Sequence, residues 1–263
     1  MSDEPDYSGE FRRLMTANVA NVIPALDRKE PWILEKIANA AERYDISENK
    51  ICDALRECDV LQFYFAKDPQ SQGMHERTAA KFICAIKGVE NFMHGPTRGK
   101  NAIYVAGGKI MSSRELRELL SADKRSRHSK SIDFIWRFGG RRFYAYHKFT
   151  EETGGGQGNQ ANDAKNFLLE CVETEESEYV FIALCDGAFY KGIDSIIGKT
   201  KMDVLKDIAA LAEHKNVFAM STRELPLFLI KHNVRKDGKD GFRLEAQRAA
   251  TPAQKRAKGE KMS

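Results

Sequence analysis

Two short apolar segments joined by a pair of glycines constrain the fold of this chain more than any other feature. The segments run from Ser131 to Phe138 and from Arg141 to Phe149, and both are rich in aromatic residues. Gly139-Gly140 lies between them and matches a two-residue hairpin turn, in which both central residues take positive φ. The pattern therefore predicts a β-hairpin at this place.

Beyond the hairpin, segments with helical periodicity alternate with short apolar segments typical of strands. Such alternation indicates an α/β domain in which at least part of the sheet is parallel. A helix is also expected to begin at the Ser221/Thr222 cap. In chain order, the expected elements are a strand over 102–106, a helix over 114–120, the hairpin, a helix over 160–172, a strand over 179–185, a helix over 202–214 and a strand over 217–220.

The N-terminal part of the chain has a different pattern. From Ser8 to about Cys58, apolar residues recur mostly every three to five positions, which is typical of helices. A polar break at 67–73 ends this stretch, and the chain from residue 236 onward is basic and poor in large apolar residues. We therefore expect a helical lobe over 1–70, an α/β core over 71–235 and a mobile basic tail over 236–263.

Composition narrows the class of protein only a little. Lys and Arg number 42 against 38 Asp and Glu, so a net charge of +4 does not by itself identify a polyanion partner. The five cysteines form no CxxC pair and have no zinc spacing, and we expect them to be reduced and mostly buried. The N-terminus is acidic and no long apolar run occurs, which predicts a cytoplasmic protein that does not enter a membrane.

An acid and a lysine in the hairpin carry the strongest indication of chemistry. Asp133 lies between apolar residues of the first strand, where an isolated carboxylate is costly to desolvate. Alternation places Tyr146 and Lys148 on one face of the second strand, so Asp133 and Lys148 can approach each other across the hairpin. Phosphodiester hydrolysis uses such a pair, with the carboxylate holding Mg²⁺ and the lysine orienting the attacking water. A structural ion pair would explain the same two residues.

This region resembles the core of type II restriction endonucleases of the PD-(D/E)xK superfamily, over about residues 74 to 230. The resemblance implies a restriction-endonuclease-like fold, with a central mixed sheet flanked by helices. It also implies sequence-specific hydrolysis of double-stranded DNA with Mg²⁺, and a homodimer, because two-fold dimers mirror palindromic sites. The features that carry it are Ser-Ile-Asp133-Phe-Ile, the strand ending in Lys148-Phe149, the stretch Gly154 to Gln160 that opens a helix, and Cys185-Asp186-Gly187 followed by aromatic residues.

One position departs from the family pattern, which has Asp or Glu two residues before the lysine. This chain has Tyr146 there, and a phenol with a pKa near 10 is a poor Mg²⁺ ligand. Similar enzymes sometimes take the acid from the helix after the lysine strand, or add a glutamate from the helix before the sheet. Asp163 fits the first arrangement, with Glu151 and Glu152 as weaker candidates, and Glu76 fits the second. We expect Glu76 and Asp163 jointly to supply the missing ligand, although each alone is also typical of a solvated surface acid.

Basic and amide side chains lie near this centre in the sequence. The glycine-rich loop lacks the lysine and serine of a nucleotide-binding loop, but it would let backbone N–H groups approach a phosphate at the next helix N-terminus. Such side chains bind the DNA backbone or base edges, although solvated loops have the same composition. The predicted DNA-binding residues are Lys124, Arg125, Arg127, Lys130, Arg141, Arg142, Gln157, Asn159 and Gln160.

Two other functions remain open on the same fold. A DNA-binding protein that has lost a metal ligand, and with it cleavage, would explain Tyr146. A structure-specific nuclease of repair or phage defence would use the same centre, because a fold does not determine the substrate.

Overall fold

The computed structural model describes residues 4–70, 73–95, 102–119, 131–151, 158–175 and 177–232. The chain forms two compact units, Met1–Ile83 and Cys84–Ser263. The boundary expected after residue 70 therefore differs from the division between the units, because the helix that starts at Met74 groups with the first unit. The predicted basic tail over 236–263 lies outside the described residues.

The first unit is helical, as the apolar periodicity predicted. A small core holds it together, in which Val22, Ile33, Ile37 and Leu55 are almost completely buried. The Asp6 carboxylate begins the first helix by accepting a hydrogen bond from the Gly9 N–H at 2.8 Å, which is an N-cap. The helices are α1 (Tyr7–Ala20), α2 (Val22–Asp27), α3 (Pro31–Tyr44), α4 (Glu48–Glu57), α5 (Asp59–Phe65) and α6 (Met74–Cys84).

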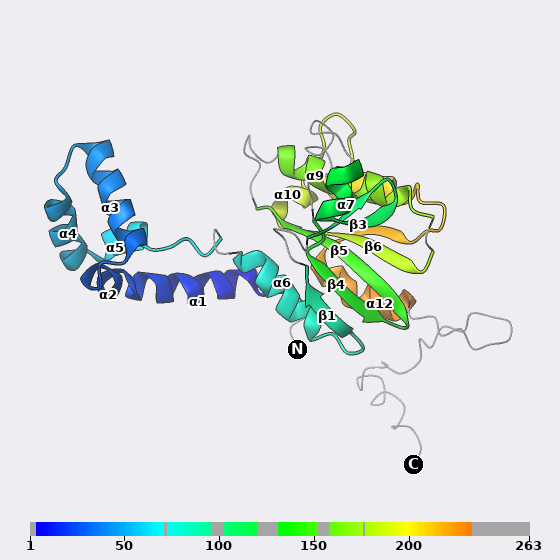
Figure 1. The fold of residues 1–263 in the computed structure, drawn as a ribbon, viewed down its shortest axis with the longest axis horizontal. Coiled ribbons are helices and arrows are strands. Elements are labelled where there is room, and N and C mark those ends of the chain that lie inside the picture. The colour runs from blue at the N-terminus through cyan, green and yellow to red at the C-terminus, as the bar shows by residue number, and fades with distance from the viewer. Residues whose placement is uncertain are drawn as a thin grey trace, which may run out of the picture. The chain divides into compact units, whose positions relative to one another are not determined.

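The second unit is built on a five-stranded mixed sheet with the strand order β1-β4-β5-β6-β7 (Figure 1). The first three strands in this order are antiparallel, and the last three are parallel. The α/β class and the partly parallel sheet expected from the sequence are therefore confirmed. The strands are β1 (Glu90–His94), β4 (Phe134–Phe138), β5 (Arg141–Phe149), β6 (Tyr179–Asp186) and β7 (Val217–Met220), and a separate pair consists of β2 (Ile103–Ala106) and β3 (Lys109–Ser112).

The glycine-glycine hairpin forms as predicted. Gly139 and Gly140 have φ values of 57° and 78°, the positive values that this two-residue turn requires. Trp136 on β4 is paired with Phe143 on β5, and their rings stack with centroids 5.3 Å apart. Cross-strand aromatic pairs of this kind stabilise a hairpin, so the turn and the ring pair together set the register of β4 and β5.

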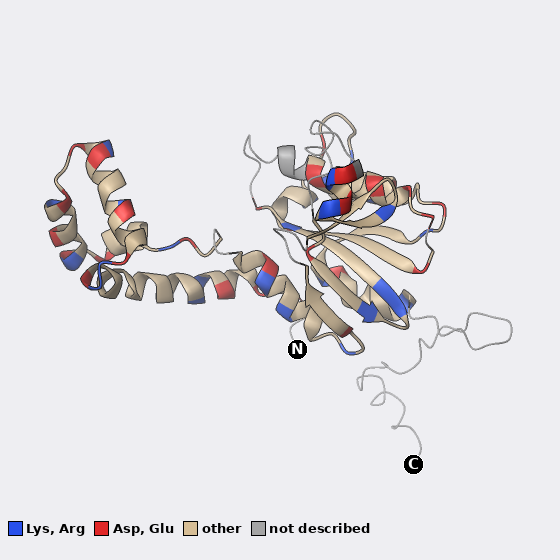
Figure 2. Cartoon of the chain, in the orientation of Figure 1, with Lys and Arg blue, Asp and Glu red and all other residues tan. Residues whose placement is uncertain are grey.

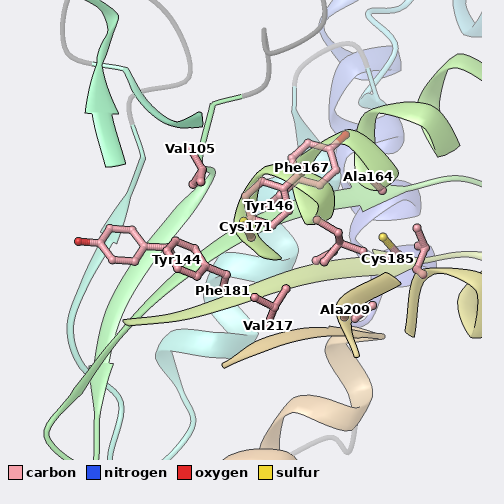
Figure 3. Packing of buried hydrophobic residues seen from close by; sticks show 14 of the residues in the cluster. Val105, Tyr144, Tyr146, Ala164, Phe167, Cys171, Phe181, Cys185, Ala209 and Val217 are labelled. Atoms are coloured by element: carbon pink, nitrogen blue, oxygen red, sulfur yellow. The ribbon is translucent and has the colours of Figure 1, made fainter. Parts of the chain in front are cut away.

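Helices cover both faces of the sheet. On one face, Tyr146 of β5 belongs to the same buried cluster as Ala164, Phe167 and Cys171, which lie on α9 (Gly158–Val172) (Figure 3). On the other face, α12 (Leu225–His232) packs through Phe228 against Phe218 of β7. The remaining helices of this unit in the described part of the chain are α7 (Ser113–Leu119), α10 (Ala188–Lys191) and α11 (Lys201–Ala209), with a 3-10 turn over Thr222–Glu224.

Three expectations need correction. Helix α11 ends at Ala209, before the expected His214, because i→i−3 bonds such as Leu211 N–H to Ile208 O tighten the chain out of the helix. The five cysteines are free, but they are not mostly buried, since Cys58 and Cys84 are exposed. Asp133 precedes β4 and does not lie inside it.

None of the described helices is long and apolar enough to cross a bilayer.

Gly187, at the end of β6, is a position where only glycine fits. Its φ is 98°, and an added Cβ would lie 2.1 Å from the backbone oxygen of Thr150. We expect Gly187→Ala to lower the free energy of unfolding by about 3 kcal/mol or more, because the backbone of two elements must shift. Gly140→Ala is the matched control, since its φ is also positive but its Cβ would meet open space. Gly140→Ala should lower the free energy of unfolding, measured in urea, by only about 1 to 2 kcal/mol. Equal losses of stability in the two variants would contradict the close approach of Gly187 to the Thr150 backbone.

Candidate active site

Asp133 is fixed to the backbone of β5 near the end of that strand. Its own N–H donates to Ala145 O at 2.8 Å, and its carboxylate Oδ2 accepts from the His147 N–H at 2.7 Å. The residue is only 7% exposed. The hydrogen bond from a backbone N–H offsets part of the cost of burying the charge. This hydrogen bond could not be predicted from the sequence, because it depends on which backbone N–H group of β5 lies opposite Asp133.

Lys148 lies near the end of β5 and is half-buried. Alternation puts it on the same face as Tyr146, and it pairs with Cys185 of β6, which belongs to the buried cluster under α9. Asp133 and Lys148 both lie at the end of the hairpin opposite the glycine turn.

Tyr146 is buried on β5, and its phenol is within electrostatic reach of two carboxylates. Burial raises the pKa of its phenol far above the ordinary value, and the negative charges of Asp163 and Asp133 raise it further. The ring packs against Phe167 of α9, with centroids 5.6 Å apart, which places the phenol beside the helix that carries Asp163 (Figure 3). Tyr146 is therefore neutral at physiological pH, and the two acids that act on it come from the hairpin and from α9.

The sequence analysis assigned no role to Tyr190, although it noted the aromatic residues that follow Asp186-Gly187. Tyr190 is buried on α10, and its pKa is raised by burial, then by Cys185 and, more weakly, by Asp163. The charge of Asp163 therefore raises the pKa of both Tyr190 and Tyr146. The sequence indication was the Asp-Gly-aromatic pattern, but only the fold shows that the aromatic side chain turns back toward α9.

The Asp186 side chain lies on the face of the sheet opposite to Tyr146 and Lys148. Its carboxylate accepts from the Thr222 N–H at 2.8 Å and from the Thr222 hydroxyl at 2.6 Å, and the His147 Nε2 lies 3.3 Å from it. All three residues are buried. This network joins the ends of β5 and β6 to the start of the 3-10 turn. His147 is therefore a buried core histidine on the face opposite to Lys148.

The other predicted acids belong to α6 and to the stretch that follows β5. Glu76 lies on α6, in the first compact unit. Glu151 is exposed just after β5, and Glu152 is outside the described residues.

Most of the predicted DNA-binding residues fall outside what the structure describes. Asn159 and Gln160 lie in the first turn of α9, without described side chains. The residues outside the described part are Lys124, Arg125, Arg127, Lys130 and Gln157.

The expectation that Arg141 and Arg142 lie next to the centre is wrong. They follow the hairpin turn at the start of β5, whereas Lys148 lies near its end, about 20 Å away at the usual rise of a strand. Figure 2 shows the positive charges at the turn end of the hairpin. Arg141 donates to Ser177 O at 2.9 Å, and Arg142 lies 3.4 Å from the Tyr144 hydroxyl. Proximity therefore gives no support to a role for these two arginines at the candidate site.

The donor set fits magnesium better than zinc. Within the described ranges, no group of three or more His, Cys, Asp and Glu side chains is arranged to hold a metal ion. Mg²⁺ needs fewer protein ligands, because it keeps several waters and usually binds one or two carboxylates together with substrate phosphate. Of the candidate acids, Asp133 and Asp163 are the two whose charges raise the pKa of Tyr146, and an Mg²⁺ ion bound here would use one or both of them.

Comparisons with known proteins leave the chain without an assigned family, since no family model, curated protein or solved structure matches it significantly.

Replacing Tyr146 by glutamate tests the convergence of acids. We expect Tyr146→Glu to lower the free energy of unfolding in EDTA by about 3 kcal/mol, because it buries a third carboxyl group beside two others. Tyr146→Phe keeps the ring and should cost about 1 kcal/mol or less. We also expect Tyr146→Glu to lower Mg²⁺-dependent cleavage. An increase in cleavage would instead mean that position 146 is a vacated ligand site and that Asp163 is not a ligand.

Proposed function

We propose that this protein is a Mg²⁺-dependent endonuclease that cleaves double-stranded DNA at specific sequences, like a type II restriction enzyme. The observation that carries the proposal is that the Asp133 carboxylate is held by the backbone of β5 near Lys148, while α9, which carries Asp163, packs on the same strand. The family pattern has a second acid where this chain has Tyr146. Asp163 is proposed to take the place of that acid, since its charge raises the pKa of the Tyr146 phenol.

Each residue has a distinct role in this proposal. When bound, Mg²⁺ would supply charge stabilisation for the phosphate at the cleaved bond. Asp133, held by the backbone of β5, and Asp163, on α9, would hold the ion. Lys148 would donate a hydrogen bond to the attacking water and help to remove its proton. Tyr146, which stays protonated, would donate a hydrogen bond to a neighbouring oxygen without adding negative charge to the centre.

The substrate part of the proposal rests on the resemblance and on the basic residues that precede Asp133 in the sequence. Double-stranded DNA is the proposed partner, contacted by the cluster from Lys124 to Lys130 and by the amides of Gln157, Asn159 and Gln160. A homodimer in the cytoplasm follows from the same proposal, because two-fold symmetry matches palindromic sites.

Digestion of phage DNA by the purified full-length protein tests this function. Incubation with Mg²⁺ should produce discrete bands, and omission of Mg²⁺ should leave the DNA intact. Discrete bands would establish both cleavage and sequence specificity. A continuous smear, or cleavage only of branched DNA, would favour a structure-specific nuclease and contradict the restriction-type proposal.

A non-cutting DNA-binding protein is the second candidate, and one observation favours it. The position of the family's second acid holds a neutral tyrosine whose pKa is raised by burial. This candidate predicts that DNA binding persists in gel-shift experiments while no cleavage occurs at any Mg²⁺ concentration.

A further inference from the structure

The loop between α10 and α11, residues 192–200, exposes an unusual amount of apolar surface. It contains three isoleucines, Ile193, Ile196 and Ile197, whose exposed fractions are 68%, 93% and 51%. Single exposed apolar residues are common, but adjacent ones at the tip of one loop mark a contact surface. The sequence analysis gave this loop no role.

Internal hydrogen bonds hold the loop in one shape. The Asp194 carboxylate accepts from the N–H groups of Ile196 and Ile197, at 3.0 and 3.3 Å. At the base, Asp194 N–H donates to Lys199 O at 2.8 Å, and Ile193 is bridged to Thr200. The isoleucines are therefore presented to solvent by a preorganised turn, so that little conformational entropy remains to be lost when a partner binds.

The loop starts beside the proposed centre. It follows α10 directly, and Tyr190 on that helix feels the charge of Asp163. The parallel strands β5 and β6 both end at the edge of the sheet from which α10 and the loop continue. Figure 1 shows this region on the side of α9 and α10, away from the β4–β5 turn. A DNA duplex at the centre would thus lie within reach of the loop.

We infer that Ile196 and Ile197 enter a groove of double-stranded DNA and contact bases there, an inference that rests on the proposed function. Apolar side chains read the methyl group of thymine in the major groove, or wedge between base steps from the minor groove. Lys191 and Lys201 flank the loop and supply positive charge toward DNA, whereas Lys199 is paired with Asp207 at 2.7 Å and the loop's own acid, Asp194, is turned to the loop backbone. These contacts make the loop a determinant of sequence specificity.

The double variant Ile196→Ser/Ile197→Ser tests the inference in the full-length protein. Its matched control is Leu227→Ser/Ile230→Ser, which removes two similarly exposed apolar residues, 65% and 59%, from α12. Gel shifts with phage DNA fragments in Ca²⁺ give affinity over a range of salt concentrations, digestion with Mg²⁺ gives cleavage, and size-exclusion chromatography gives the oligomeric state.

We expect the loop variant to bind at least about tenfold more weakly than the control and to cleave correspondingly more slowly. The slope of log affinity against log salt should stay unchanged, because isoleucine releases no counterions. Loop and control variants that bind and cleave alike, while the native protein cleaves, would overturn the inference and leave the proposed function intact. Loss of an oligomer in the loop variant alone would assign the surface to a second copy of the chain and also overturn it. A native protein that neither binds nor cuts DNA would refute the proposed function and this inference together.

Discussion

Replacing Asp133 by asparagine is expected to abolish Mg²⁺-dependent DNA cleavage while the protein stays folded. The carboxylate is proposed to hold the metal, and the loss of metal-based charge stabilisation amounts to several kcal/mol, or roughly a thousandfold or more in rate. The amide oxygen of asparagine can still accept the 2.7 Å hydrogen bond from the His147 N–H. The variant also removes a buried negative charge, so the free energy of unfolding should not fall by more than about 1 kcal/mol.

The measurement compares digestion of phage DNA by the two proteins and gel shifts in Ca²⁺, with urea unfolding as a check of the fold. Glu118→Gln is a suitable control, because it neutralises an exposed carboxylate of α7 that pairs with Arg114 on its own helix. It should cleave as the native protein does. Full activity in Asp133→Asn would place the cutting centre elsewhere in the chain.

Replacing Asp163 by asparagine should have the second large effect. If this residue is the acid that stands in for the one expected at position 146, its loss removes one of two proposed carboxylate ligands. We expect cleavage to fall by at least about a hundredfold, with the requirement for Mg²⁺ shifted to higher concentration. Stability should change little, because Asp163 is only partly buried. The matched control is Glu170→Gln on the same helix.

Glu76→Gln separates the two candidate acids. The sequence analysis expected Glu76 and Asp163 to act jointly, and this expectation predicts a loss of cleavage in each single variant. If cleavage is lost in Asp163→Asn but not in Glu76→Gln, the second ligand lies on α9. Glu76, on α6, would then have no role in cleavage. Unchanged cleavage in Asp163→Asn would contradict the role of α9 in the centre.

Several elements could be predicted because their causes are local. The glycine pair needs positive φ at two successive residues, and the aromatic strands beside it need a partner, so the hairpin follows from neighbouring residues alone. The strand over 217–220 and the cap at Ser221, which opens a 3-10 turn before α12, are local in the same sense. The end of α11 could not be predicted, because alanine and leucine favour a longer helix there and the packing of the following turn prevails.

The residues of the candidate site also divide into those that local sequence identified and those that only the fold brings into the argument. Asp133 and Lys148 were identified because each stands out from its sequence neighbours, as an acid among apolar residues and as a lysine after aromatic ones. Arg141 and Arg142 were placed wrongly, because closeness in sequence ignores the length of the strand that separates them from Lys148. Tyr190 was overlooked as a neighbour of Asp163, since 27 positions of chain separate the two residues.

The sequence by itself determined the α/β class, the helical first part, the hairpin and the two residues at its end, because periodicity and turn chemistry act over a few residues. Only the tertiary structure decided that Asp133 is held by a backbone N–H of β5, that Asp163 and Asp133 both act on Tyr146, and that Asp186 belongs to the opposite face. These contacts join residues of different elements, and their side chains meet only after the parallel crossover from β5 through α9 to β6 has formed.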